Sequence, residues 1–159
     1  MARLSNLAKW ILYADDANII VTADSEEETY QKVDEASRNL VKWVHKNGLC
    51  LNLRKTHYMV FSNCRNKLDR RLIINNTAIE RVKEARFLGV IIDEKLTWKS
   101  HIDAIRTKMS RYLGTLFRIK HVIPKSARLQ IYHSFIRSHL NYCSLVWGFF
   151  IRIRHRITI

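Results

Sequence analysis

Two adjacent carboxylates near the start of the sequence are the residues best suited to chemistry. Asp15 and Asp16 lie between two apolar runs, residues 10–14 and 17–21. Each run is typical of a short buried strand, and the polar pair between them indicates a tight turn. Such a hairpin would hold both carboxylates at its tip, where Mg²⁺ takes carboxylate oxygens and keeps positions for substrate phosphates and water. The alternative is a solvated turn, because Asp favours turns through local backbone hydrogen bonds.

A helix that could support this hairpin is predicted directly after it. Ser25 suits the N-cap position, and Glu28 follows three residues later, as in a capping box. Glu26, Glu27 and Glu28 complement the positive end of the helix dipole, so capping explains them and we assign them no catalytic role. Gly48 fits the position just after the last turn. The expected apolar face consists of Tyr30, Val33, Ala36, Leu40, Val41 and Val44.

Short strands are predicted in the middle of the chain. Residues 58–61 form one, and residues 72–79 form a hairpin whose turn is Asn75-Asn76, because Asn tolerates a positive φ. Residues 87–93 are predicted as a further apolar strand. Gly89 in that strand would let another backbone approach closely, since it has no Cβ. A core strand with a bulge is an equally compatible interpretation.

The last third of the chain has a helical pattern. Apolar residues recur at spacings of three and four from Trp98 onward, and Pro124 suits the start of a second helix. We expect a break at residues 137–139, a last short helix at 140–148 and a frayed basic tail at 149–159. The predicted core positions are Trp98, Ile102, Ile105, Met109, Leu113, Leu116, Leu129, Ile131, Tyr132, Phe135 and Ile136.

Charge is distributed unevenly along the chain, whose formal net charge is +14. Residues 1–50 contain six Lys/Arg and eight Asp/Glu, whereas residues 51–159 contain 22 Lys/Arg and six Asp/Glu. A metal-binding end followed by a polyanion-binding end would give this pattern, and a generally basic surface is the alternative. The cations that we assign to nucleic-acid contacts are Lys99, Arg106, Lys108, Arg111, Arg118, Lys120, Lys125 and Arg128.

Length and composition favour an intracellular globular protein, nuclear or cytoplasmic, of one domain or slightly more. The 159 residues are 47% hydrophobic, which is enough for a core. No apolar run reaches the ~18 residues of a membrane-spanning helix, and Lys9 interrupts any signal-peptide core. The three cysteines are widely spaced and show no zinc-binding pattern, so reduced thiols are expected.

Four motifs, in this order, resemble the reverse transcriptases of non-LTR (LINE-type) retrotransposons. The sequence Tyr13-Ala14-Asp15-Asp16 resembles the YxDD active-site hairpin of that family. Leu51-Asn52-x-x-Lys55-Thr56 resembles the loop after its palm helix, and Phe87-Leu88-Gly89 with the following residues to Asp93 resembles its primer-grip hairpin. The ending Tyr142-x-Ser144-x-x-Trp147-Gly148 is similar to the end of its helical thumb.

The resemblance implies an α+β fold: a small antiparallel palm sheet with a covering helix, followed by a helical thumb bundle. Residues 1–95 would be a partial palm, residues 96–148 the thumb and residues 149–159 a divergent basic tail. The short segment before the hairpin indicates a truncated palm and thumb portion, without fingers and without the upstream metal-binding aspartate. Because two metal ions need several carboxylate ligands, we expect no measurable polymerase activity from this chain by itself.

The resemblance also implies roles for individual residues. Asp15 and Asp16 would be catalytic ligands of Mg²⁺ in the intact enzyme, and Lys55 would be a general acid that protonates the leaving pyrophosphate. The residues implied to contact substrate or primer are Tyr13, Phe87, Leu88 and Gly89. The implied partners are an RNA template, a DNA primer, deoxynucleotides and the missing fingers and palm region, with no membrane.

Two functions of different classes remain open at this point. The first is a fragment of an RNA-directed DNA polymerase, which performs two-metal nucleotidyl transfer when intact. The second is a non-catalytic remnant or domesticated module that binds nucleic acid through its basic helices. A plain structural α+β protein is a third interpretation, but it leaves the coincidence of the Tyr-Ala-Asp-Asp and Lys-Thr motifs unexplained.

Overall fold

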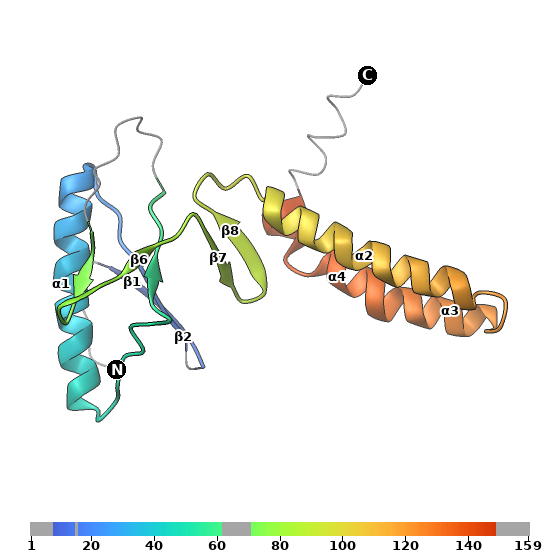
Figure 1. Ribbon diagram of the computed structural model, residues 1–159, viewed down its shortest axis with the longest axis horizontal. Coiled ribbons are helices and arrows are strands. Elements are labelled where there is room, and N and C mark those ends of the chain that lie inside the picture. The colour runs from blue at the N-terminus through green and yellow to red at the C-terminus, as the bar shows by residue number, and fades with distance from the viewer. Residues whose placement is uncertain (1–7, 15, 62–70, 149–159) are drawn as a thin grey trace, which may run out of the picture. The chain divides into compact units, whose positions relative to one another are not determined.

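The computed structural model describes residues 8–14, 16–61 and 71–148 (Figure 1). The chain divides after Val82 into two compact units. The first unit contains β1 (Lys9–Tyr13), β2 (Asp16–Ile20), α1 (Glu26–Lys46), β3 (His57–Tyr58), β4 (Ile73–Ile74), β5 (Thr77–Ala78) and β6 (Glu80–Arg81). The second contains β7 (Glu84–Phe87), β8 (Val90–Asp93), α2 (Lys99–Ile119), α3 (Lys125–Ile131), the π-helix η1 (Tyr132–Arg137) and α4 (Ser138–Asn141). Residues 144–148 are helical as well.

Among the described residues, the strands form four separate two-stranded pairs. β1 with β2, β4 with β5 and β7 with β8 are antiparallel, whereas β3 and β6 are parallel. The single small antiparallel sheet expected from the sequence is therefore not formed by the described residues. Strands β3 to β6 are only two residues long. Strands this short have few free backbone N–H and C=O groups that could pair with an additional strand.

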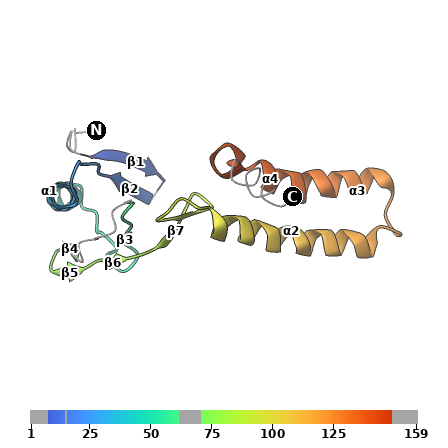
Figure 2. The same ribbon diagram turned by 90° about the horizontal axis from the view of Figure 1, so that it is seen from above.

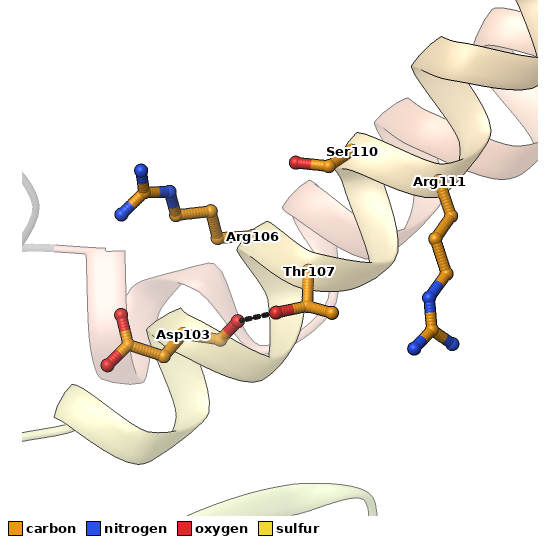
Figure 3. A pocket seen from close by; sticks show the side chains of 5 residues that line it. All are labelled: Asp103, Arg106, Thr107, Ser110 and Arg111. Carbon is orange, nitrogen blue, oxygen red and sulfur yellow. Dashed lines mark hydrogen bonds between the residues drawn. The ribbon is translucent and has the colours of Figure 1, made fainter.

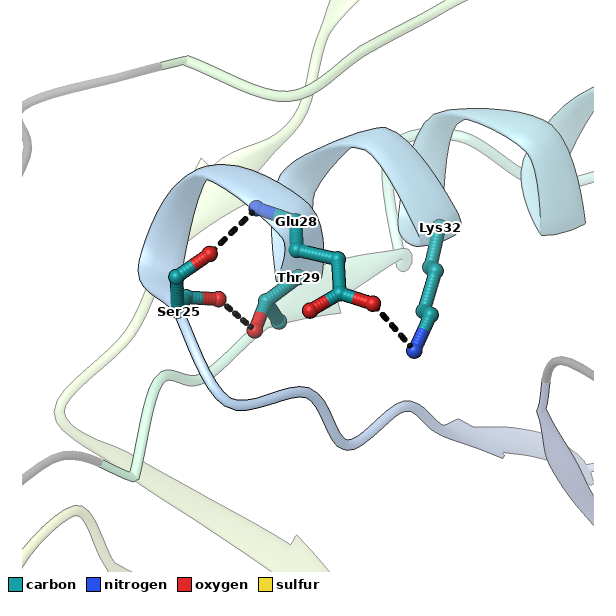
Figure 4. A network of polar contacts seen from close by, with 4 residues as sticks. All are labelled: Ser25, Glu28, Thr29 and Lys32. Carbon is teal, nitrogen blue, oxygen red and sulfur yellow. Dashed lines mark hydrogen bonds and ion pairs between the residues drawn. The ribbon is translucent and has the colours of Figure 1, made fainter.

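Helix α1 begins where the sequence predicts (Figure 4). The Ser25 hydroxyl accepts a hydrogen bond from the Glu28 backbone N–H at 3.1 Å, which satisfies one of the free donors of the first turn. The Glu28 carboxylate pairs with Lys32 Nζ at 2.9 Å. The hydrogen bond and charge of Lys32 lower the pKa of Glu28, and the Asp24 backbone contributes less. Glu28 is thus a capping-turn residue, as predicted, but its carboxylate faces Lys32 one turn further on.

The core of the first unit lies between α1 and the β4–β5 hairpin. Leu72, Ile74 and Ile79 are buried, and the α1 residues Val33 and Val41 pack against them. Asn75 and Asn76 both have positive φ, 48° and 57°, which confirms the predicted Asn-Asn turn. The predicted strand at residues 58–61 is shorter and shifted, because β3 contains only His57 and Tyr58.

The second unit has a core of two tryptophans and a strand residue. Val90 of β8 packs with Trp98 and Trp147, which are 7% and 2% exposed. This contact places the β7–β8 hairpin with the helices, so the division falls after Val82 and not after residue 95 as expected. In both views α2 runs beside the α3–η1–α4 segment (Figures 1 and 2).

Two expectations for these helices are wrong. The break predicted at residues 137–139 is absent, because helical residues continue from Lys125 to Asn141 through η1. The break comes instead at residues 142–143, where Cys143 has a φ of 50°. Several predicted core side chains are also about half exposed, and these are Leu113, Leu129, Tyr132 and Phe135. Tyr112 takes the inward position on α2, with its ring 5.5 Å from that of Phe135 and 5.6 Å from that of His139.

Membrane insertion and thiol state were also predicted from the sequence. Among the described residues, no helix combines the length and apolarity needed to cross a membrane. Cys50 and Cys143 are exposed free thiols, and Cys64 lies outside the described residues.

Candidate functional site

The carboxylate pair belongs to the β1–β2 hairpin. Tyr13, the last residue of β1, pairs with Asp16, the first residue of β2. Ala14 has a φ of 51°, the left-handed conformation that a tight turn requires. Asp15 lies outside the described residues. The hairpin is more exposed than the buried strands that the sequence predicts, since Leu12 and Ile20 are 47% and 46% exposed.

The Asp16 carboxylate is available for a ligand. It is exposed, and it has neither a hydrogen bond nor an ion pair with any other described residue. Tyr13 is 61% exposed beside it. Within the described ranges, no group of three or more His, Cys, Asp or Glu side chains converges as a metal cluster. Any cation at this hairpin would therefore need further ligands from a substrate or from another part of the protein.

Lys55 lies in the loop that follows α1. Its backbone N–H donates to the Asn52 carbonyl at 3.1 Å, and the Thr56 hydroxyl donates to the same carbonyl at 3.0 Å. These two bonds close a compact turn over the predicted Leu-Asn-x-x-Lys-Thr motif and leave the Lys55 side chain exposed. Exposure suits a mobile proton donor, and it is equally typical of a surface lysine.

The predicted primer-grip residues form a tight turn in the second unit. Phe87 ends β7, Val90 begins β8, and the two residues pair across the hairpin. Leu88 and Gly89 between them have φ values of 46° and 83°, which is typical of a type I′ turn. The strand predicted for residues 87–93 is therefore confirmed only from Val90 to Asp93, because Leu88 and Gly89 turn the chain before it. Gly89 supplies a positive φ, and its close neighbour is the Tyr142 side chain at 3.6 Å from an added Cβ, not another backbone.

Asp93 is a structural residue to which the sequence prediction gave no role. Its Oδ1 accepts hydrogen bonds from the backbone N–H groups of Lys95 and Thr97, at 3.1 and 3.0 Å. Its Oδ2 accepts from the Trp98 N–H at 2.8 Å and from the Thr97 hydroxyl at 3.2 Å. Burial alone would raise the pKa of Asp93, but these hydrogen bonds outweigh it and lower the pKa. Trp98 precedes α2, and its side chain caps no helix donor among the described residues. Asp93 instead accepts from the Trp98 N–H at the helix start and fixes the loop before it.

Replacing Asp93 should destabilise the second unit. The Asp93→Ala variant leaves three backbone donors without their acceptor, and we expect a loss of about 2–4 kcal/mol in the free energy of unfolding. Urea unfolding followed by tryptophan fluorescence measures this loss. Asp93→Asn should fall between wild type and Asp93→Ala, because the amide keeps one acceptor oxygen. Wild-type stability in Asp93→Ala would contradict the capping role.

His101 is buried in the first turn of α2, where its surroundings disfavour the protonated form. Its Nδ1 lies 3.3 Å from the Ile91 backbone N–H, which donates to it, and its ring stacks edge-on against Trp147 at 5.4 Å. Its Nε2 is buried without a partner among the described residues. Burial, with a smaller contribution from the Arg86 charge, lowers the pKa of His101 below 6.5. A proton on Nδ1 would also oppose the Ile91 N–H.

The stability of the second unit should therefore fall as the pH is lowered below about 6.5. The unfolded chain has the higher His101 pKa, so it binds the proton first and acid favours unfolding. Urea unfolding at pH 7.5 and pH 5.5 measures the difference. His101→Gln should reduce this pH dependence, whereas the same change at exposed His133 should leave it in place. A pH dependence that is identical in wild type and His101→Gln would exclude His101 as its source.

The cations of the second unit are mostly exposed on α2 and α3. Lys99, Arg106, Lys108, Arg111, Arg118 and Lys125 are exposed, and none of them forms an ion pair within the part of the chain that the structure describes. Lys120 lies over the Phe117 ring, with Nζ 3.5 Å from its centroid. Arg128 is half-buried, and its Nε has no partner among the described residues. Residues 104–159 contain no Asp or Glu, so this part of the sequence has a large net positive charge.

Two of these cations, Arg106 and Arg111, line a pocket on α2 (Figure 3). The other residues that line it are Asp103, Thr107 and Ser110. Arg106 and Arg111 point to opposite sides of the helix, and the Thr107 hydroxyl donates to the Asp103 carbonyl at 2.9 Å. The two guanidinium groups thus do not converge on one small anion. They lie on two flanks of α2 instead, and each flank could follow a separate stretch of phosphates.

Comparisons with known proteins point to the same group of proteins that the motifs resemble. The chain is 29% identical over 123 residues to the retrovirus-related Pol polyprotein from the type-1 retrotransposable element R1 of Nasonia vitripennis. It is 20% identical over 139 residues to a probable RNA-directed DNA polymerase from the transposon X-element of Drosophila melanogaster. It is 24% identical over 140 residues to the RNA-directed DNA polymerase from the mobile element jockey of Drosophila funebris. This chain is related to the RNA-directed DNA polymerases of non-LTR retrotransposons.

The relationship covers most of this chain but only part of each relative. The matches cover 74% to 86% of the chain, 36% of the R1 polyprotein and 15% of each of the other two proteins. The chain thus spans about a third or less of the curated relatives that it matches. No family model and no solved structure matches the chain.

Proposed function

We propose that this chain is the C-terminal palm and thumb portion of an RNA-directed DNA polymerase from a non-LTR retrotransposon. The observation that carries the proposal is the Tyr13-Ala14-Asp15-Asp16 sequence at a β-hairpin, in a chain whose relatives are polymerases of this class. The intact enzyme would copy an RNA template by extending a DNA primer with deoxynucleotides. The β1–β2 hairpin would supply acidic ligands, and the helices of the second unit would bind the nucleic acid.

The hairpin carboxylates could supply some of the ligands of a magnesium ion. Asp16 presents an exposed carboxylate without a partner among the described residues, and Asp15 is its neighbour in sequence. Mg²⁺ is commonly bound by one or two carboxylates together with substrate phosphates and water. When bound, it would neutralise charge on the reacting phosphates and orient them. The remaining ligands would come from an upstream palm segment or the nucleotide.

Other residues of the chain would act on the substrates directly. Lys55, exposed in its compact turn, would donate a proton to the leaving pyrophosphate. Tyr13 would face the incoming nucleotide, since it pairs with Asp16 and is 61% exposed. The Phe87, Leu88 and Gly89 turn would contact the primer end.

A manganese titration of the purified chain tests the metal-binding part of this proposal. Paramagnetic Mn²⁺ binds at sites of this type and broadens the NMR signals of nearby amides. We expect selective broadening of the Tyr13, Ala14 and Asp16 amides, reduced in Asp16→Asn and in Asp15→Asn. Asp24→Asn is the matched control, because Asp24 is an exposed carboxylate that follows β2. Broadening that is equal in Asp16→Asn and wild type would remove the hairpin as a metal site.

A non-catalytic nucleic-acid-binding module is the second candidate. It is favoured by the exposed cations of α2, which have no ion-pair partners among the described residues. Both candidates predict nucleic-acid binding by the second unit. Only the polymerase candidate predicts selective manganese broadening at the hairpin, so the titration distinguishes them.

A further inference from the structure

The two distant motifs of the second unit are joined by one short hydrogen bond. The Tyr142 hydroxyl donates to the Leu88 carbonyl oxygen at 2.6 Å, across 54 residues of sequence. Tyr142 stands just after α4, at the break before the last helical residues. Leu88 is the first residue of the β7–β8 turn. The bond therefore ties the tip of the hairpin to the end of the helical segment.

The turn needs this support because its first residue is strained. Leu88 has a φ of 46°, in the left-handed region that side chains other than those of Asn and Asp rarely adopt. Its side chain is 38% exposed, so burial in a core does not explain why leucine adopts this conformation. Strain of this kind persists where surrounding contacts fix the backbone, and it is common at binding sites.

Tyr142 is itself held firmly. Its carbonyl accepts a hydrogen bond from Trp147 Nε1 at 2.9 Å, and Trp147 is only 2% exposed. The Tyr142 ring also covers Gly89, where an added Cβ would lie 3.6 Å from Cε1. Trp147 packs in the same core as Val90, the residue that follows the turn. The turn is thus fixed on one side by Val90 and on the other by Tyr142.

We propose that Tyr142 is a positioning residue that holds the Leu88–Gly89 turn in the conformation that meets the primer 3′ end. The proposal rests on the proposed function, which makes this turn a primer contact. Tyr142 acts through the turn backbone and does not touch the reacting atoms. Its hydroxyl fixes the Leu88 carbonyl, so the exposed Leu88 side chain and the neighbouring Phe87 are presented in one orientation.

Photocrosslinking of the purified chain tests this role. The probe is an RNA template annealed to a DNA primer that ends in 4-thiothymidine, and mass spectrometry maps the crosslinks. We expect the primer end to crosslink within residues 86–90 of the wild-type chain. Tyr142→Phe keeps the ring but loses the hydroxyl, so the crosslink yield should fall about ten-fold while the overall Kd changes less than two-fold. Tyr132→Phe is the matched control, because Tyr132 is an exposed tyrosine with no recorded hydroxyl bond among the described residues.

A second substitution distinguishes a loss of turn positioning from a general loss of folded structure. Asn adopts positive φ more readily than Leu, so Leu88→Asn in the Tyr142→Phe background should restore the crosslink at Phe87, the primer contact that this variant keeps, without restoring the hydroxyl. Wild-type crosslinking in Tyr142→Phe would overturn the positioning role while leaving the primer contact intact. Absence of any crosslink at residues 86–90 in the wild-type chain would overturn both the positioning role and the proposed primer contact.

Discussion

The affinity of this chain for single-stranded RNA is expected to fall about 60-fold when the salt concentration rises from 50 to 200 mM. Each phosphate neutralised on a single strand contributes about −0.7 to the slope of log affinity against log salt, and four engaged cations give a slope of roughly −3. The second unit can supply these contacts, because its exposed cations have no ion-pair partners among the described residues. Sequence preference should be weak, since phosphates carry no base information. Fluorescence anisotropy over a range of salt concentrations measures the slope.

Charge reversal on one flank of α2 should abolish most of the salt dependence of RNA binding. Lys108, Arg111 and Arg118 lie on the same flank, because residues three and seven apart on a helix share a side. Their replacement by Glu should weaken binding about 100-fold at low salt and flatten the slope to about −1. The matched control reverses Arg38, Lys42 and Lys46, three exposed cations of α1 in the first unit. Equal loss in both triple variants would show that total charge, rather than this flank, drives binding.

The sequence predicted local structure best where one residue type determines the backbone. Ser25 and Gly48 set the start and end of α1, and Asn75-Asn76 sets the β4–β5 turn. Leu88 was missed as a turn residue because leucine rarely adopts positive φ, and the contact that supports it lies 54 residues away. The break at residue 142 was missed for a similar reason, since neither Gly nor Pro marks it.

The motifs of the candidate site could be predicted from the sequence, but the contacts that support these motifs could not. Asp16 lies on the predicted hairpin, and its role as a metal ligand remains a proposal. Asp93 and Tyr142 belong to motifs that the sequence contains, but the motifs assign neither residue a function. Their partners, the N–H groups of residues 95–98 and the Leu88 carbonyl, are backbone atoms that no side-chain pattern reveals. A sequence pattern of side chains cannot predict a hydrogen bond to a backbone N–H or carbonyl group, because nearly every residue type carries these groups.

Loss of either hairpin carboxylate is expected to have the largest effect on catalysis. We consider a chimaeric polymerase in which residues 8–148 of this chain replace the matching segment of the jockey enzyme of Drosophila funebris. In that setting Asp15→Asn or Asp16→Asn should reduce primer extension by about a thousand-fold, equivalent to about 4 kcal/mol of transition-state stabilisation. The amide keeps the size of the side chain but removes the charge that a metal ligand needs. Asp24→Asn, which changes an exposed carboxylate after β2, should have little effect.

Primer extension by this chimaera tests the central claim most directly. We predict Mg²⁺-dependent incorporation of deoxynucleotides on an RNA template by the chimaera with the natural hairpin, and no incorporation above background by Asp16→Asn. The 159-residue chain alone is the negative control, because we expect it to extend no primer. Extension that proceeds equally well in Asp16→Asn, or a folded, RNA-binding chimaera that extends no primer, would contradict the assignment of this chain to the catalytic part of a polymerase.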